Sequence, residues 1–135
     1  MIMRAALENI MPLWPQVAPL LERPLAVSVT HELEDVRRMI MSGHAHLWVQ
    51  WTDHVEAAVV SEFISYPRGL FLNAWLAGSI DGEMDRLGFV EALREWARLN
   101  GCVRLRATGR AGWLKVVPGS LIEGLVMSTP VETLE

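Results

Sequence analysis

Hydrophobic and polar residues alternate along the middle of the chain. In HLWVQWT (46–52) every second residue is apolar, and the alternation resumes after a short turn and continues over 55–66. A period of two is typical of strands with one buried face, so the two stretches predict a β-hairpin. The next apolar stretch, LFLNAWLA (70–77), is almost continuous, which favours a central strand covered on both faces.

Two other segments have the spacing of an amphipathic helix. The first covers 30–42, where Thr30 can cap the start and Gly43 provides a stop. The second covers 83–99 and ends before Asn100-Gly101, a favourable C-terminal stop.

The N-terminal part is predicted to be less regular. Apolar spacing predicts a short helix over 2–11, which Pro12, Pro15 and Pro19 then interrupt, because proline cannot donate to the backbone ladder of a helix. One or two further turns are expected over 15–21.

The pattern after residue 101 predicts a strand over 102–107, a short helix over 110–117 and a last strand over 122–128. A hairpin followed by strand, helix and strand implies an α/β (α+β) fold, with a mixed, mostly antiparallel sheet and helices on both faces. We therefore expect one domain over 1–135, composed of an N-terminal helical segment, 1–29, and a core, 30–128.

Composition narrows the function classes. The 135 residues include 12 Lys and Arg against 16 Asp and Glu, for a net charge of −4, which argues against a dedicated nucleic-acid binder. The longest uncharged apolar stretch, GLFLNAWLAGSI, is too short to span a membrane. A single cysteine, Cys102, cannot form an internal disulfide, so a reducing, cytoplasmic location is the expectation. Six tryptophans accompany only one tyrosine.

The order of elements resembles the GNAT acyltransferase fold, that of the Gcn5-related N-acetyltransferases. LFLNAWLAG followed by MDRLGFVEALREWARLNGCVRLRAT is similar to the core strand of the family, its pyrophosphate-binding helix and the next strand. GRAGWLKVVPG resembles the final helix, and LIEGLVMST the last strand. The short chain and its GRAGW step also resemble phage or prophage proteins, which would make a virion an alternative location.

The resemblance implies acetyl-CoA or another acyl-CoA as cofactor, with its pyrophosphate on the backbone amides at a helix start. The corresponding loop, 78–85, retains Gly78 and Gly82 but carries acids where phosphate charge would arrive, so it is degenerate. Those acids are equally suited to begin an ordinary helix. The cofactor-binding residues that the resemblance implies are Trp75, Ala77, Ser79, Gly82 and Glu83.

Two residues are candidates for catalysis. Glu62 lies on the same face as Val60 and Ile64, so burial would raise its pKa and suit a general base; the alternative is a glutamate at the rim of the sheet. Asn73 interrupts the buried strand and either orients a substrate or is a core amide with its own partners. The family often uses a tyrosine near the final helix as an acid, but Trp113 lies there, and the only tyrosine, Tyr66, ends an earlier strand.

Other constellations are weaker. His44, His46 and His54 could approach one another across the hairpin, but they lack a carboxylate at a metal-site spacing, so we expect exposed histidines and no metal site. The basic stretch around Arg104 and Arg106 is followed by the segment Thr108–Gly112, which could hold an anion at a helix start. The alternative is a turn whose basic side chains point to solvent.

Two functions remain open. One is an acyl-CoA-dependent N-acyltransferase acting on an amine. The other is a non-catalytic GNAT-like interaction or assembly protein, a class that includes phage components and homo-oligomers, whose Trp- and Met-rich composition suits contact surfaces. Neither involves nucleic acid or a membrane.

Overall fold

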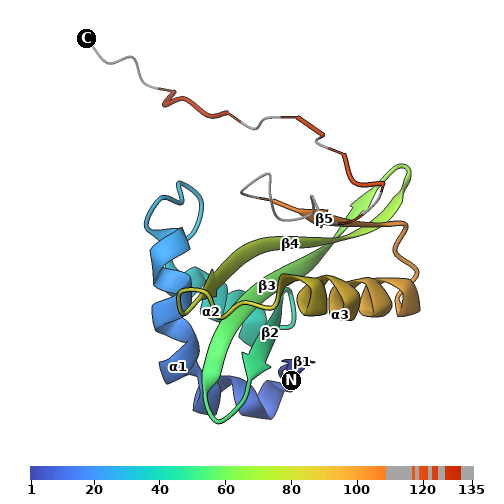
Figure 1. The fold of residues 1–135 in the computed structure, drawn as a ribbon. Coiled ribbons are helices and arrows are strands. Elements are labelled where there is room, and N and C mark those ends of the chain that lie inside the picture. The colour runs from blue at the N-terminus through green and yellow to red at the C-terminus, as the bar shows by residue number, and fades with distance from the viewer. Residues whose placement is uncertain (109–116, 118, 122, 125–126, 132–135) are drawn as a thin grey trace.

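The computed structural model describes residues 1–108, 117, 119–121, 123–124 and 127–131 (Figure 1). The described elements, in chain order, are β1 (Ile2–Arg4), α1 (Leu7–Leu25), α2 (Leu33–Met41), β2 (His46–Trp51), β3 (Val55–Tyr66), β4 (Gly69–Ser79), α3 (Arg86–Leu99) and β5 (Arg104–Ala107).

The strands form one five-stranded sheet in the order β1-β2-β3-β4-β5. Neighbours are antiparallel from β1 to β4, whereas β5 runs parallel to β4 after the α3 crossover. The predicted α+β fold with a mixed, mostly antiparallel sheet is confirmed. In Figure 1 the tip of the long β3–β4 hairpin projects beyond the helices.

The two faces of the sheet carry separate cores. Alternate strand residues such as Leu47 and Val60 pack with Val17 and Leu21 of α1 and with α2, which defines the α1/α2 face. The other strand residues pack against Phe89 and Leu93, on the α3 face. The side-chain alternation of β-strands thus explains why apolar residues follow one another in β4 with Asn73 as the one polar residue between Leu70 and Ala77.

The N-terminal prediction was wrong. Residues 2–4 form a strand that pairs with β2, and a single helix then runs through Pro12, Pro15, Pro19 and Pro24. The first three prolines have i, i+3, i+7 spacing and are exposed, so water can bond the carbonyls that lose their partners. On the opposite side of α1, Ile10, Val17, Leu21 and Leu25 are buried. Their packing overrides the weak propensity, because tertiary contacts provide most of a helix's stability.

Two local features of β4 decide how its residues point. The register with β3 jumps from Val60↔Leu76 to Ser61↔Ala74, so Trp75 is an additional residue in a β-bulge. Gly78 lies inside β4 and not in the following loop, and a Cβ there would come within 1.8 Å of the Leu20 carbonyl oxygen. The glycine therefore allows α1 to approach the strand closely.

The remaining sequence predictions differ from the structure mainly at their ends. The helices predicted over 30–42 and 83–99 are present over 33–41 and 86–99, and the strand predicted over 102–107 covers 104–107. The helix predicted over 110–117 lies almost wholly outside the described residues. Of the strand predicted over 122–128, the described residues 123–124 and 127–128 belong to no strand. Among the described residues, no helix combines the length and apolar content needed to cross a bilayer.

Candidate functional site

Three polar side chains form one row across the sheet. Glu62 of β3 pairs in register with Asn73 of β4, and Asn73 pairs with Arg106 of β5. Their neighbours along each strand point to α3, so all three lie on the α1/α2 face. Adjacent strands are about 4.8 Å apart, which places the first and last members of the row roughly 10 Å apart along the sheet.

Glu62 is a half-buried carboxyl group. Burial raises its pKa above the ordinary value, and the charge of His31, in the connection between α1 and α2, acts in the opposite direction. A carboxyl group with a raised pKa accepts a proton more readily than an exposed one, which is the property required of a general base.

Asn73 is 6% exposed. Its Oδ1 accepts a hydrogen bond of 2.9 Å from Oγ1 of Thr108, just beyond β5. The bond orients the amide and fixes the end of β5 against β4. It supplies the partner that a buried asparagine needs and also holds the amide beside Glu62.

Trp75 occupies the bulge on the same face. Its ring centroid is 4.8 Å from that of His31, and its buried Nε1–H has no hydrogen-bond acceptor among the described residues. A buried donor without a partner costs about 1–3 kcal/mol, so this N–H is a place where an acceptor atom would be stabilising.

The β4–β5 pairing ends early. Its last register pair is Ala74↔Ala107, followed by one bond of 2.9 Å from the Thr108 amide to the Ala74 carbonyl. β4 continues to Ser79, so no strand in the described part of the chain covers this edge of residues 75–79. Ala77 and Ser79 both belong to the uncovered edge.

The acidic loop between β4 and α3 has a structural role. Asp85 caps α3 by accepting a bond of 3.0 Å from the Gly88 amide, and Gln50 accepts one of 2.7 Å from the Asp85 amide. Asp81 pairs with Arg23 at 3.3 Å in an exposed contact. Gly82 has a φ of +76°, and the Glu83 carbonyl accepts from Gln50. The predicted cofactor loop is therefore held by the Asp85 cap and by Gln50.

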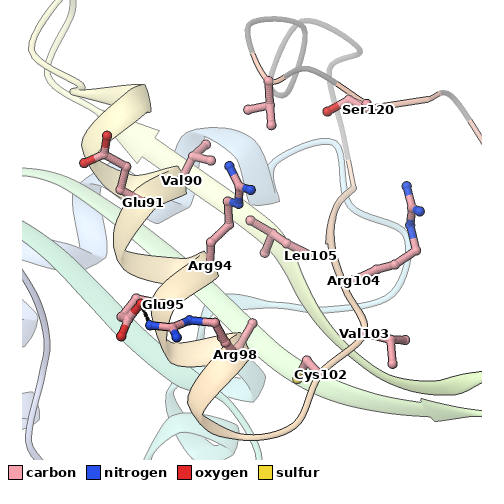
Figure 2. A pocket seen from close by; sticks show the side chains of 13 residues that line it. Val90, Glu91, Arg94, Glu95, Arg98, Cys102, Val103, Arg104, Leu105 and Ser120 are labelled. Carbon is pink, nitrogen blue, oxygen red and sulfur yellow. Dashed lines mark hydrogen bonds and ion pairs between the residues drawn. The ribbon is translucent and has the colours of Figure 1, made fainter.

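A groove of about 610 Å³ lies elsewhere, between α3 and β5. Figure 2 shows Arg94 of α3 and Arg104 of β5 beside it, with the ion pair of Glu95 and Arg98 along the helix. None of the predicted site residues lines this groove. The row on the α1/α2 face therefore lies away from this groove.

The histidines do not form a metal centre. His46 is half-buried against Phe63 and Trp96, at ring distances of 4.9 and 4.5 Å, and its Nδ1 is 3.0 Å from Ser61 Oγ. Burial, reinforced by the charge of Arg4, lowers its pKa to about 4. The expectation of an exposed histidine was wrong at this position. The described residues contain no group of three or more His, Cys, Asp or Glu that could hold a metal ion.

Sequence reasoning missed His31 and the surroundings of Arg106. Arg106 lies beside Tyr66 and Phe71, whose rings are 5.0 Å apart, although Arg106 is at least 35 positions from either residue in the sequence. The same-side spacing of Arg104 and Arg106 in an apolar strand was the one available signal.

Searches with the sequence find no matching family model and no matching curated protein. Solved structures, in contrast, match over nearly the whole chain. A crystal structure of a probable acetyltransferase is 12% identical with a TM-score of 0.71, covering 99% of both chains. A predicted acetyltransferase with acetyl-CoA from Clostridium acetobutylicum is 11% identical with a TM-score of 0.69, covering 96% of this chain and 95% of the other.

A third similar structure is an aminoglycoside acetyltransferase from an uncultured soil metagenomic sample in complex with sisomicin. It is 13% identical with a TM-score of 0.71, covering 100% of this chain and 96% of the other. Identities this low establish the architecture alone. The chain therefore has the fold of the GNAT acetyltransferases.

Proposed function

We propose that the chain transfers an acyl group from acyl-CoA to an amine, with Glu62 as general base. The observation that carries the proposal is the half-buried carboxyl of Glu62, in register with Asn73 and close to the uncovered edge of β4 beyond Ala74. A proton acceptor next to an unpaired strand edge suits acyl transfer from a long, amide-bearing donor.

The β4 edge fits part of acyl-CoA. The amide-bearing arm of the coenzyme would hydrogen-bond along this edge as an added strand does, lined by Trp75, Ala77 and Ser79. At the phosphate end, Gly82 gives the backbone room to turn, but Asp81 and Glu83 oppose negative charge. We therefore expect binding through the arm, weakened at the phosphates.

Acyl-CoA, when bound, supplies the thioester whose acyl carbon the amine attacks. Glu62 would accept the proton of the amine nitrogen as the new C–N bond forms and the C–S bond breaks, and the coenzyme departs as its thiolate. Asn73 would orient the amine beside the carboxylate. Tyr66 lies at the far end of β3 and hydrogen-bonds to Arg106, so it is not positioned to donate a proton.

Two measurements test the proposal. Calorimetry and thermal unfolding with acetyl-CoA should show saturable binding, and a ligand at 100 times its Kd should stabilise the fold by about 2.7 kcal/mol. Release of free thiol should follow when a panel of amines is added. No binding and no thiol release at millimolar acetyl-CoA would refute the proposal.

A second candidate, a non-catalytic interaction or assembly protein, is favoured by one observation. Asp85 already occupies an amide at the start of α3, and the loop around it is acidic, which disfavours a phosphate ligand. This candidate predicts self-association or a stable protein partner in light scattering and pull-down experiments. A strict monomer that binds acetyl-CoA would exclude it.

A further inference from the structure

Arg106 is fixed on the α1/α2 face by two aromatic rings. Its guanidinium carbon lies 4.8 Å from the centroid of Tyr66 and 4.8 Å from that of Phe71. Its Nη1 also donates to the Tyr66 hydroxyl. Residues on three strands, β3, β4 and β5, thus hold the planar cation in one orientation.

The remaining donors of Arg106 hold a carboxylate. Nε donates to Oε2 of Glu123 at 2.9 Å, and Nη2 donates to Oε1 at 2.7 Å. Two parallel bonds of this kind are the strongest and most directional way for arginine to recognise a carboxylate. Glu123 is 17 residues further along the chain, and it belongs to no helix or strand.

Arg106 is oriented by groups other than Glu123. The ion pair of Arg98 and Glu95 provides the contrast, because both residues lie one turn apart on the exposed side of α3, and among the described residues no aromatic ring stacks on the Arg98 guanidinium. The contacts of Arg106 with the rings of Tyr66 and Phe71 and with the Tyr66 hydroxyl do not involve Glu123, so they remain when another carboxylate replaces that of Glu123. With Arg106 24% exposed and Glu123 44% exposed, the position is open to solvent.

We propose that Arg106, Tyr66 and Phe71 form a binding site for a ligand carboxylate, which Glu123 of the same chain occupies in competition with that ligand. The ligand that fits is a carboxylate on a short aliphatic arm, because the side chain of Glu123, which has that form, occupies the site. The inference concerns binding and does not require acyl transfer. In combination with the proposed function, a site on the same face of the sheet as Glu62 selects acceptor amines that carry a carboxylate.

The test uses the full chain and glutarate, which copies the glutamate side chain, as the probe in calorimetry at constant ionic strength. Glu123→Ala should bind glutarate about tenfold more tightly than the wild type, because the tethered competitor is removed. Adding Arg106→Lys to that variant should abolish the gain, since lysine keeps the charge but not the two-pronged geometry. The neutral analogue glutaramide should bind to none of them.

Glu95→Ala is the matched control, because it changes the net charge equally and frees Arg98 from an exposed ion pair. The proposal is overturned when Glu95→Ala gains as much affinity as Glu123→Ala, or when Glu123→Ala, shown to be folded by thermal unfolding, gains none. An unfolded Glu123→Ala also overturns it, since Glu123 would then be a structural tether. Glutarate binding without acyl transfer to any amine would support this site and refute only the proposed function.

Discussion

Glu62 and Asn73 lie directly opposite each other across β3 and β4, on the face of the sheet that carries α1 and α2. Asn73 accepts its hydrogen bond from Thr108, on the β5 side. The half-buried carboxyl group of Glu62 has no arginine or lysine partner among the described residues. An unpaired carboxyl of this kind can change its protonation state without breaking an ion pair.

Replacing Glu62 with glutamine should lower kcat for acyl transfer about 100-fold, the usual contribution of a general base. Binding of acetyl-CoA should change little. In the wild type, kcat/KM should fall as the pH falls through the pKa of Glu62, which burial places above its ordinary value, because the base must be ionised. Steady-state kinetics across pH would measure both effects.

Glu91→Gln on the exposed side of α3 is the control, because it removes the same charge away from the row. Equal loss of activity in the two variants would show that Glu62 acts only through net charge. A Glu62→Gln enzyme with wild-type kcat would exclude a proton-accepting role.

Replacing Gly78 with alanine should destabilise the fold by about 2–3 kcal/mol. The new Cβ would meet the Leu20 carbonyl oxygen at 1.8 Å, and both atoms belong to packed backbone that must move. Gly82→Ala is the comparison: its Cβ has open space, and only the φ of +76° is unfavourable, at about 1 kcal/mol. Denaturant unfolding would measure both. A larger loss for Gly82→Ala would contradict the close approach of α1 to β4.

The sequence predicted those elements whose pattern is local. The alternation in β2 and β3 and the apolar run in β4 survive in the fold, because side-chain period and burial are linked residue by residue. The N-terminal helix was mispredicted because the sequence shows that its four prolines disfavour a helix, but it does not show that Val17 and Leu21 are buried against the sheet.

The candidate site was predictable only in part. Glu62 and Asn73 were identifiable as polar residues in apolar strands, and their pairing follows in unbroken register from the tight turn at Tyr66↔Gly69. The bulge at Trp75 lies beyond that pairing, and no local pattern indicates it. The contacts of Arg106 with Tyr66 and Glu123 join residues 40 and 17 positions away. Such pairings arise from topology and long-range packing, so they require the fold.

Acid should destabilise the protein through His46. In the unfolded chain a histidine titrates near pH 6.5, whereas in the fold the pKa of His46 is about 4. Between these values the unfolded chain binds a proton that the folded chain does not, so the stability present above about pH 6.5 is lost as the pH falls toward 4. The full difference corresponds to about 3 kcal/mol, and partial solvent exposure reduces our expectation to about 1–2 kcal/mol.

Chemical denaturation at pH 7 and pH 4.5 would measure this loss. His46→Gln should show a smaller loss than the wild type, because glutamine does not titrate. His44→Gln, at an exposed position, should leave the loss unchanged. Identical pH dependence in the wild type and His46→Gln would rule out His46 as the source.

Reversing one charge in the acidic loop should strengthen the binding of acetyl-CoA. Asp81 is 92% exposed in its side chain, and its pairing with Arg23 at 3.3 Å is a surface contact that contributes little to stability. Asp81→Lys should therefore leave the fold intact while converting repulsion of the phosphates into attraction. Two unit charges 4 Å apart interact by about 1 kcal/mol in water, and the reversal both removes a repulsion and adds an attraction. Calorimetry at low salt should therefore show a Kd about tenfold lower or more.

Glu95→Lys separates local from general attraction. It also breaks an exposed ion pair and changes the net charge by the same amount, but it lies ten residues along α3 from Asp85, roughly 15 Å by helical rise. That distance exceeds the screening length at 0.1 M salt. At this salt concentration the effect of Glu95→Lys on acetyl-CoA binding should therefore vanish, while part of the gain from Asp81→Lys persists. Equal gains at both positions would mean that the coenzyme phosphates do not lie at the start of α3, and the acidic loop would then have no bearing on whether this fold binds acyl-CoA.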